Sequence, residues 1–288
     1  MVVCTHVRCQ PAFLAIRLPP LVLGAAAFVR DHGHGARAQG KACRPGSRAD
    51  DNRGRLLLRL LGSRAFRDGV GCEVALGELD GVGAVLGADQ GALDFEALSG
   101  AGVEFVYAKA TEGATHVDSQ FAATCGQARG SRVALGAYHF FSFDSPGAAQ
   151  AASFVATASK AWGDPAIRAL RPAVDVEWYA DKEQNPPEAE DVRRELRAFV
   201  DAVEVACGSK PLIYVGNDIY ARYLRGHFDD CDLWISCRKW PAWVEWPQGG
   251  WTIWQFSDVG EVPGAANEDG YVDLDVLAPG IAVDDLDM

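Results

Sequence analysis

The sequence predicts an α/β fold, a TIM-like (β/α) barrel that is irregular or incomplete on its helical side. Three observations support this prediction. From about residue 82 onward, eight short apolar runs alternate with helical or irregular segments. Several runs are apolar throughout, as is typical of parallel strands that are buried on both faces. The segments that follow Val215 are short, so some outer helices are expected to be missing.

The eight predicted strands are separated by segments long enough for a helix or a loop. In chain order they are Val82–Ala88, Val103–Lys109, Val133–Phe140, Pro172–Glu177, Pro211–Val215, Asp232–Ser236, Thr252–Phe256 and Tyr271–Val276.

Three connecting segments have the pattern of helices. The clearest is Pro187–Cys207, where apolar residues recur at helical spacing and Gly208 provides a stop signal. Its apolar positions are Val192, Leu196, Phe199, Val200 and Val203. Asp118–Gly130 and Pro146–Trp162 are also predicted to be helical.

The beginning of the chain differs in composition from the rest. Residues 1–70 hold 12 Lys and Arg against 4 Asp and Glu, whereas the remaining residues hold 15 against 35. We predict that residues 1–78 form a largely unstructured Arg-rich extension and that 79–288 form the barrel. The overall net charge of −12 argues against a general nucleic-acid binder.

The N-terminus has features of a secretion signal. An apolar run, Leu18–Val29, precedes a small-x-small cleavage pattern at Ala36-Arg37-Ala38, which predicts a signal peptide over 1–38 and a secreted protein. The run is too short to span a membrane, so stable membrane insertion is not expected. The alternatives are an unstructured tail or sequence that does not belong to the protein.

The eight cysteines have no C-x-x-C spacing, so neither a zinc site nor a redox site is predicted. If the protein is exported, some of these cysteines could pair in disulfides; buried free thiols are the alternative.

A pair of carboxylates, Asp175 and Glu177, ends one predicted strand. Residues two apart in a strand face the same way, so the two side chains should project together, roughly 6.5–7 Å apart along the backbone. Carboxylates held this close cannot both ionise freely, which tends to raise one pKa. Such a pair suits the cleavage of a glycosidic bond. The alternative is a strand end whose acids are bound in salt bridges or by water.

Other predicted strands also end in polar or aromatic side chains, at the barrel end where chemistry gathers. They are Lys109, Tyr138, His139, Tyr214, Trp254, Gln255 and Asp273. Six of the eight tryptophans fall between Trp234 and Trp254, and an indole face can stack on a sugar ring. About half of them should be structural. We expect Lys109, His139, Trp254 and Gln255 to bind substrate, Trp254 being the best stacking candidate.

Ordered motifs along the chain resemble the family 25 glycoside hydrolases, the Chalaropsis-type lysozymes. The resemblance covers about Gly83 to Ala278, and its motifs are specific when taken together and in order. They are Lys109-Ala110-Thr111-Glu112-Gly113, Gly136-Ala137-Tyr138-His139-Phe140, Asp175-Val176-Glu177, Pro211-Leu212-Ile213-Tyr214, Leu233-Trp234-Ile235, Trp254-Gln255-Phe256 and Val272-Asp273-Leu274-Asp275.

The resemblance implies an N-acetylmuramidase that hydrolyses the β-1,4 bond between N-acetylmuramic acid and N-acetylglucosamine in bacterial peptidoglycan. It implies that Glu177 is the general acid, that Asp175 orients the substrate's N-acetyl group, and that Asp273 completes the acidic cluster. Tyr138 and Tyr214 would line the sugar subsite. Neither a metal nor an organic cofactor is implied. We expect a monomer whose partners are the glycan strands of peptidoglycan.

The first strand departs from the family pattern. The family motif Asp-x-Ser-x-x-Gln-Gly ends in register at Gln90-Gly91, which puts Val85 where the family has a catalytic Asp. Either this acid is absent, or a neighbour such as Asp80 or Asp89 compensates, or the upstream sequence is a divergent or misread segment. This departure keeps open a catalytically impaired barrel that binds peptidoglycan or chitin.

A third possibility is a chitinase-like barrel, which shares the Asp-x-Glu strand end. The longer acidic run of that family is absent, because Ala173 and Val174 precede Asp175.

Overall fold

The computed structural model describes residues 93–236, 250–265, 271–278 and 280–288, together with the backbone of 65–67, 73–75 and 82–86. The chain divides into two units, Met1–Gly62 and Ser63–Met288. The first unit, and with it the predicted signal peptide, lies outside the described residues. So do Gln90-Gly91, Asp80, Asp89, Trp240, Trp243 and Trp246. In the described part of the chain, no helix combines the length and the apolar character that crossing a membrane requires.

Eight strands form a closed ring of hydrogen-bonded neighbours. Their order is β3-β11-β10-β9-β8-β7-β6-β4, and a β3–β4 pairing closes the ring. All eight predicted strands are present. They are β3 (Val82–Leu86), β4 (Phe105–Glu112), β6 (Ala134–Phe140), β7 (Ala173–Val176), β8 (Leu212–Gly216), β9 (Leu233–Ser236), β10 (Ile253–Gly260) and β11 (Val272–Leu277).

The expectation of parallel strands holds for seven of these strands and is wrong for β11. β11 pairs antiparallel with both β10 and β3. The segment that joins β10 to β11 covers only residues 261–271. A parallel neighbour needs a crossover of a dozen or more residues, whereas a shorter connection reverses the chain direction.

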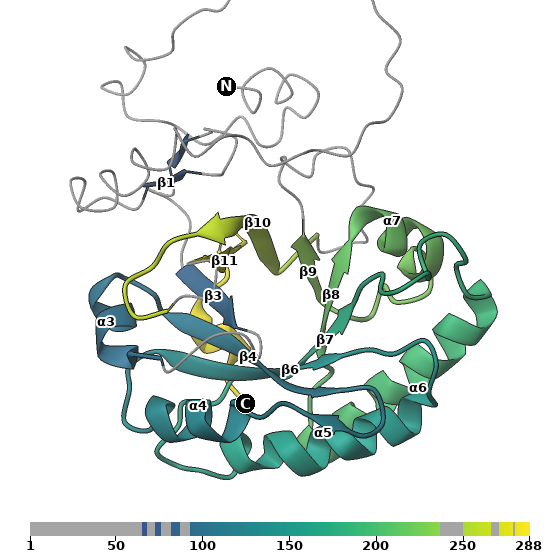
Figure 1. Ribbon diagram of the computed structural model, residues 1–288, viewed down its shortest axis with the longest axis horizontal. Helices are drawn as coiled ribbons and strands as arrows, with labels where there is room; N and C mark the ends of the chain where they lie inside the picture. Colours follow the sequence, from purple (N-terminus) through teal and green to yellow (C-terminus); the bar gives the residue numbers. More distant parts are fainter. Residues whose placement is uncertain are drawn as a thin grey trace, which may run out of the picture. The chain divides into compact units, whose positions relative to one another are not determined.

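The helices are concentrated on the outer face of the first half of the barrel (Figure 1). The three predicted helices are α4 (Phe121–Ala128), α5 (Gly147–Trp162) and α6 (Ala189–Cys207), and α6 ends at Gly208 with a φ of 86°. A further short helix, α3 (Phe95–Gly100), begins where Asp94 caps the backbone N–H groups of Glu96 and Ala97.

In the second half of the barrel, the helical elements that the described residues form after β8 are short. α7 (Asn217–Ile219) runs into a π-helical turn, η3 (Tyr220–Leu224), and the chain ends in a 3₁₀ turn, η5 (Val283–Leu286). The prediction of a barrel that is incomplete on its helical side is therefore confirmed.

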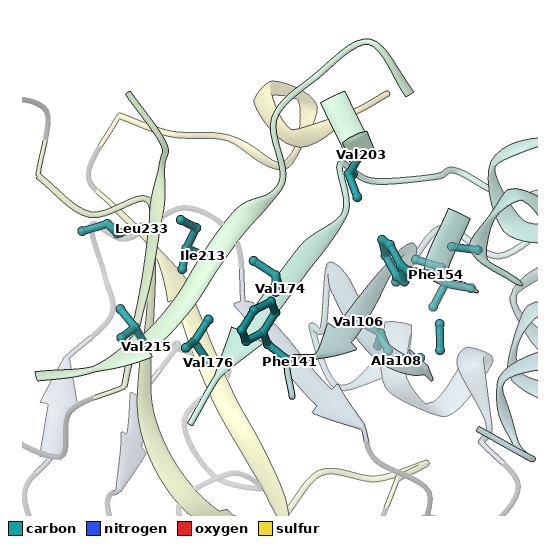
Figure 2. Close-up of a cluster of buried hydrophobic side chains, with 14 of the residues drawn as sticks. Val106, Ala108, Phe141, Phe154, Val174, Val176, Val203, Ile213, Val215 and Leu233 are labelled. Carbon is teal, nitrogen blue, oxygen red and sulfur yellow. The ribbon is translucent and has the colours of Figure 1, made fainter. Parts of the chain in front are cut away.

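Alternating residues of the strands face two separate cores. The outer core contains Val106 and Ala108 of β4 and Val174 and Val176 of β7, packed with helix residues such as Phe154 (Figure 2). The inner core fills the barrel itself. Its members include Phe105, Tyr107, Tyr138, Ala173, Leu212, Tyr214, Trp234, Ile253 and Leu277.

A close approach between β6 and the Tyr107 ring explains why residue 136 is a glycine. A Cβ on Gly136 would lie 2.2 Å from a carbon of the Tyr107 ring, so only glycine leaves room for that ring. The ring can then reach across the barrel, where the Tyr107 hydroxyl donates a hydrogen bond of 2.9 Å to the backbone carbonyl of Arg171.

The C-terminal segment covers the end of the barrel opposite the carboxyl ends of its parallel strands. Val283 and Leu286 of η5 belong to the inner core. The backbone N–H of Arg171 donates to the carbonyl of Leu286 at 2.7 Å, and Arg168 forms ion pairs with Asp284 and Asp287. This end of the barrel is closed, so a site that needs solvent access must lie at the other end.

One element lies where the sequence predicted a largely unstructured extension. β1 (Ala65–Arg67) and β2 (Glu73–Ala75) pair antiparallel.

A further two-residue strand, β5 (His116–Val117), pairs with the end of β4 and extends the sheet beyond the ring.

Candidate active site

Asp175 and Glu177 lie at the carboxyl end of β7. The Asp175 backbone pairs with Phe140 of β6 on one side and with Tyr214 of β8 on the other. Asp175 is only 9% exposed, and Glu177 follows the strand as a half-buried residue. A sequence ending its buried strand in Asp-x-Glu therefore carries both acids into the mouth of the barrel.

The structure brings two tyrosines and a glutamine to the same inner face. Tyr138 lies on β6 and Tyr214 on β8, both in the inner core. The Tyr214 hydroxyl donates to Oε1 of Gln255 at 2.8 Å, and the Ser236 hydroxyl donates to the same oxygen at 3.0 Å. These bonds fix the amide of Gln255 and orient the phenol of Tyr214 beside the acids.

Asp273 enters the site from the opposite side of the ring. It lies on β11, and its charge acts on Tyr138, Asp175 and Tyr214. Its backbone pairs with Val85 of β3, which in turn pairs with Tyr107 of β4. Val85 therefore occupies a register position between Asp273 and Tyr107, where the family pattern predicts an acid.

Lys109 of β4 supplies a positive charge that acts on Asp175. Its ammonium forms an ion pair with Glu112 at 2.7 Å and lies 4.9 Å from the centre of the Phe140 ring. Its positive charge partly offsets the rise of the Asp175 pKa. Lys109 is half-buried within β4, three residues before its end.

The pKa values of both acids are raised above their ordinary range. For Asp175 the main cause is burial, followed by the negative charge of Glu177. Burial also raises the pKa of Glu177; the Tyr214 hydroxyl opposes this rise and the charge of Asp218 adds to it. Oδ1 of Asp175 is buried without a hydrogen-bond partner among the described residues. The arrangement favours one shared proton on the pair, which is what a general acid requires.

The prediction that His139 binds substrate was wrong. Its ring is fully buried on the outer face of β6 and stacks on Phe199 of α6 at 4.8 Å. Nδ1 lies 2.7 Å from the Thr111 hydroxyl and Nε2 lies 2.9 Å from the Gln150 amide oxygen. The physical reason is the alternation of a strand: since Tyr138 faces the inside of the barrel, His139 must face the helices.

The prediction for Trp254 fails for the same reason. Trp254 is 3% exposed and packs in the outer core, with its ring 6.1 Å from that of Trp251 and 5.9 Å from that of Phe256. Its neighbour Gln255 faces the inside instead.

A buried acid below the site was not singled out from the sequence. Asp275 is fully buried, and its Oδ1 accepts a hydrogen bond of 2.8 Å from the indole N–H of Trp234, while Oδ2 has no partner among the described residues. Burial, with the charge of Asp273, raises its pKa well above the ordinary range. The signal was the period of two in Asp273-Leu274-Asp275, which puts both acids on the inner face.

Comparison with known proteins agrees with this geometry. The family model described as glycosyl hydrolases family 25 matches residues 87–265. That match begins just after β3, the strand in which Val85 departs from the family pattern.

Individual relatives point the same way. The chain is 31% identical over 180 residues to the uncharacterized protein YegX of Escherichia coli K12, covering 62% of this chain and 61% of that protein. It is 30% identical over 196 residues to the autolytic lysozyme of Clostridium acetobutylicum, covering 67% of this chain and 55% of that protein. The chain thus spans less than two thirds of the length of these curated relatives.

A solved structure of a family 25 glycosyl hydrolase from Bacillus anthracis superimposes with a TM-score of 0.60 at 32% identity, covering 69% of this chain and 89% of that one. The family model, these relatives and the acids at the end of β7 lead to one conclusion: the chain belongs to the family 25 glycosyl hydrolases.

Proposed function

We propose that the chain is a lysozyme, an N-acetylmuramidase that hydrolyses the β-1,4 bond between N-acetylmuramic acid and N-acetylglucosamine in bacterial peptidoglycan. The observation that carries the proposal is the Asp175–Glu177 pair at the mouth of a barrel that is closed at its other end. A relative is named autolytic lysozyme, and a solved structure is that of a muramidase from Acremonium alcalophilum, 26% identical with a TM-score of 0.56.

Glu177 is the proposed general acid. It is half-buried, so it is desolvated enough for its pKa to rise and still open enough to reach a glycosidic oxygen. Protonating the leaving oxygen removes the need to expel an alkoxide, and a positioned acid of this kind contributes roughly 10²–10⁴-fold to the rate.

Asp175 is proposed to orient the substrate's N-acetyl group, whose carbonyl oxygen can attack the anomeric carbon in a substrate-assisted route. Oδ1 of Asp175 supports this role because it is buried with no hydrogen-bond partner in the described part of the chain, and such an oxygen is available to an amide N–H of the ligand. Asp273 completes the acidic cluster, and Tyr138, Tyr214, Gln255 and Lys109 are proposed to bind the sugar.

The alternative function is a barrel that binds peptidoglycan or chitin without efficient cleavage. It is favoured by one observation: Val85 holds the register position between Asp273 and Tyr107. An apolar residue there supplies neither charge nor a hydrogen bond to the cluster.

We further propose that the protein acts outside the cell, as a monomer, on the glycan strands of the bacterial wall. The predicted signal peptide over 1–38 and the wall-directed names of the relatives support this proposal.

Clearing of a peptidoglycan suspension by the full chain tests the first function. We expect clearing by the wild type, a rate at least about 100-fold lower for Glu177→Gln, and no change for Glu183→Gln, an exposed glutamate on the same loop. Equal clearing by the wild type and Glu177→Gln would refute the acid assignment.

A sedimentation assay with the same insoluble peptidoglycan separates the alternative. Retention of the protein without clearing would favour the binder. Soluble chitin oligomers added as competitors report whether N-acetylglucosamine polymers occupy the same site.

A further inference from the structure

Asp218 lies beside Glu177 at the end of the neighbouring strand. β7 and β8 pair in register up to Val176 and Val215, so Gly216 is the β8 position next to Glu177. Asp218 follows two residues later in α7 and folds back over this position. Its Oδ1 lies 3.3 Å from the point where a Cβ on Gly216 would be. The carboxylate therefore rests at the carboxyl end of β8, the strand that pairs with β7.

Trp178 ties Asp218 to the chain that carries Glu177. The indole N–H of Trp178 donates a hydrogen bond to Oδ2 of Asp218. The Trp178 ring is itself held in an aromatic cluster, 5.8 Å from the Tyr223 ring and 5.9 Å from the Phe143 ring. The residue directly after Glu177 is thus fixed by packing, and it fixes Asp218 in turn.

Asp144, which contacts the Tyr179 hydroxyl two residues after Glu177, differs from Asp218 in its charge environment. Asp144 accepts hydrogen bonds from the Tyr179 hydroxyl at 2.9 Å and from the Lys182 ammonium at 2.5 Å. Its negative charge is therefore neutralised locally. Asp218 has no ion pair with a lysine or arginine within the described ranges, so its charge is not cancelled in this way.

We propose that Asp218 is a positioning residue for Glu177: its uncompensated carboxylate, held by the Trp178 indole, keeps the Glu177 carboxyl in its protonated form. The role rests on the proposed function, because a protonated Glu177 matters only to an enzyme that uses it as an acid. Asp218 also adds an acid at the mouth of a barrel whose first strand has Val85 where the family pattern has an Asp.

Among the described residues, Asp175 of β7, Tyr138 of β6 and Tyr214 of β8 also interact with Glu177, and Asp273 of β11 acts on these three groups. Burial is the largest cause of the raised Glu177 pKa; the Tyr214 hydroxyl opposes the rise, and the charge of Asp218 adds to it. Asp175 carries a raised pKa of its own, so the proton is shared between two acids. Asp218 is the exposed member of this group.

Direct titration of the Glu177 carboxyl tests the proposal without requiring turnover. The full chain is labelled with ¹³C at the glutamate side-chain carboxyls, and the Glu177 signal is assigned by its absence in Glu177→Gln. Asp218→Asn removes the charge and keeps an oxygen that can accept from Trp178. We expect its Glu177 midpoint to fall by about half a pH unit or more.

Asp181→Asn is the matched control, because Asp181 is an exposed acid on the loop that follows Glu177. It should leave the midpoint within about 0.2 pH unit of the wild type. The difference between wild type and Asp218→Asn should shrink in 1 M salt, since an exposed charge is screened there.

Three results would overturn the proposal: an unchanged midpoint in Asp218→Asn, an equal shift in Asp181→Asn, or a shift that salt does not reduce. Asp218→Ala, which also removes the hydrogen bond from Trp178, serves as a second variant if Asp218→Asn does not fold. It should shift the Glu177 midpoint in the same direction. If the wild type fails to clear peptidoglycan, the proposed function fails while the titration still reports on Asp218.

Discussion

The two faces of the barrel sheet use neighbouring residues of the same strands in different ways. On the inner face Tyr138, Asp175 and Gln255 meet at the mouth of the barrel, with hydroxyl, carboxyl and amide groups close together. On the outer face His139, Val174 and Trp254 pack under the helices or within the outer core. A shift of one residue thus separates a group that can meet substrate from one that cannot.

The difference teaches that a polar residue at a strand end is not by itself a sign of function. His139 is as polar as Tyr138, yet its ring satisfies both nitrogens with Thr111 and Gln150 inside the protein. Burial lowers the pKa of His139 to about 4, so its ring is neutral at neutral pH. His139 therefore contributes to the packing of the outer core, whereas the candidate site lies on the inner face.

His139→Leu is expected to have the largest effect on stability and none on substrate affinity. The change removes the ring partner of the Thr111 hydroxyl and one of the two donors to the Gln150 amide oxygen, which should lower the free energy of unfolding by about 2 kcal/mol. Urea denaturation at pH 7 measures this loss, with the exposed His116→Leu as a control that should stay at the wild-type value.

The loss of stability in His139→Leu should also depend on pH. A histidine whose pKa is lowered by folding stabilises the protein above its unfolded pKa of about 6.5, and this contribution disappears as the pH falls towards 4. The gap between wild type and His139→Leu should therefore be smaller at pH 5 than at pH 7. An increased KM for peptidoglycan with unchanged stability would contradict the assignment of His139 to the outer face.

Val85→Asp is expected to raise the rate of peptidoglycan clearing by about tenfold, an effect worth about 1.4 kcal/mol. The new carboxyl would stand at the register position between Asp273 and Tyr107, where the family pattern has an acid. Initial rates of clearing at several pH values measure the effect.

Ala84→Asp provides the control for the strand, because Ala84 pairs with Leu274, a buried residue of the outer core. It should lower stability and leave the rate per folded molecule unchanged. A gain in rate for Ala84→Asp equal to that for Val85→Asp would show that the face of β3 does not matter.

Much of the fold could be predicted from the sequence, since apolar runs of strand length identify strands without knowledge of their partners. The direction of β11 could not, because it depends on how far the chain can travel between residues 261 and 271. At the candidate site, Asp175, Glu177 and Asp273 were predicted from their spacing and motifs, and their roles stay predictions.

The errors at the site have a common physical origin. His139 and Trp254 were assigned to substrate because neither Tyr138-His139 nor Trp254-Gln255 reveals which member of the pair faces inward. Asp218 was missed because its position depends on a fold-back over Gly216 and a contact with Trp178, and neither leaves a trace in the local sequence.

Asp275→Asn is expected to have the smallest effect on stability. The sign of this effect reports on the buried interior of the barrel rather than on the acids at its mouth. Burial raises the Asp275 pKa well above the value it has in an unfolded chain, so the folded state binds the proton more tightly. The stability that this group contributes is fully present below the pKa it has in the unfolded chain. It is lost as the pH rises through the pKa it has in the folded protein. Asn keeps an oxygen for the Trp234 indole and has no proton to lose.

The variant should therefore match the wild type near pH 4 and exceed it by about 1 kcal/mol at pH 8, as measured by urea denaturation. Tyr107→Phe offers a contrast, because its hydroxyl donates to the Arg171 carbonyl in the same core and its loss should weaken the fold at both pH values. If Asp275→Asn is less stable than the wild type at pH 8, the carboxylate form is the one the barrel binds, and the inner core is more polar than its packing indicates.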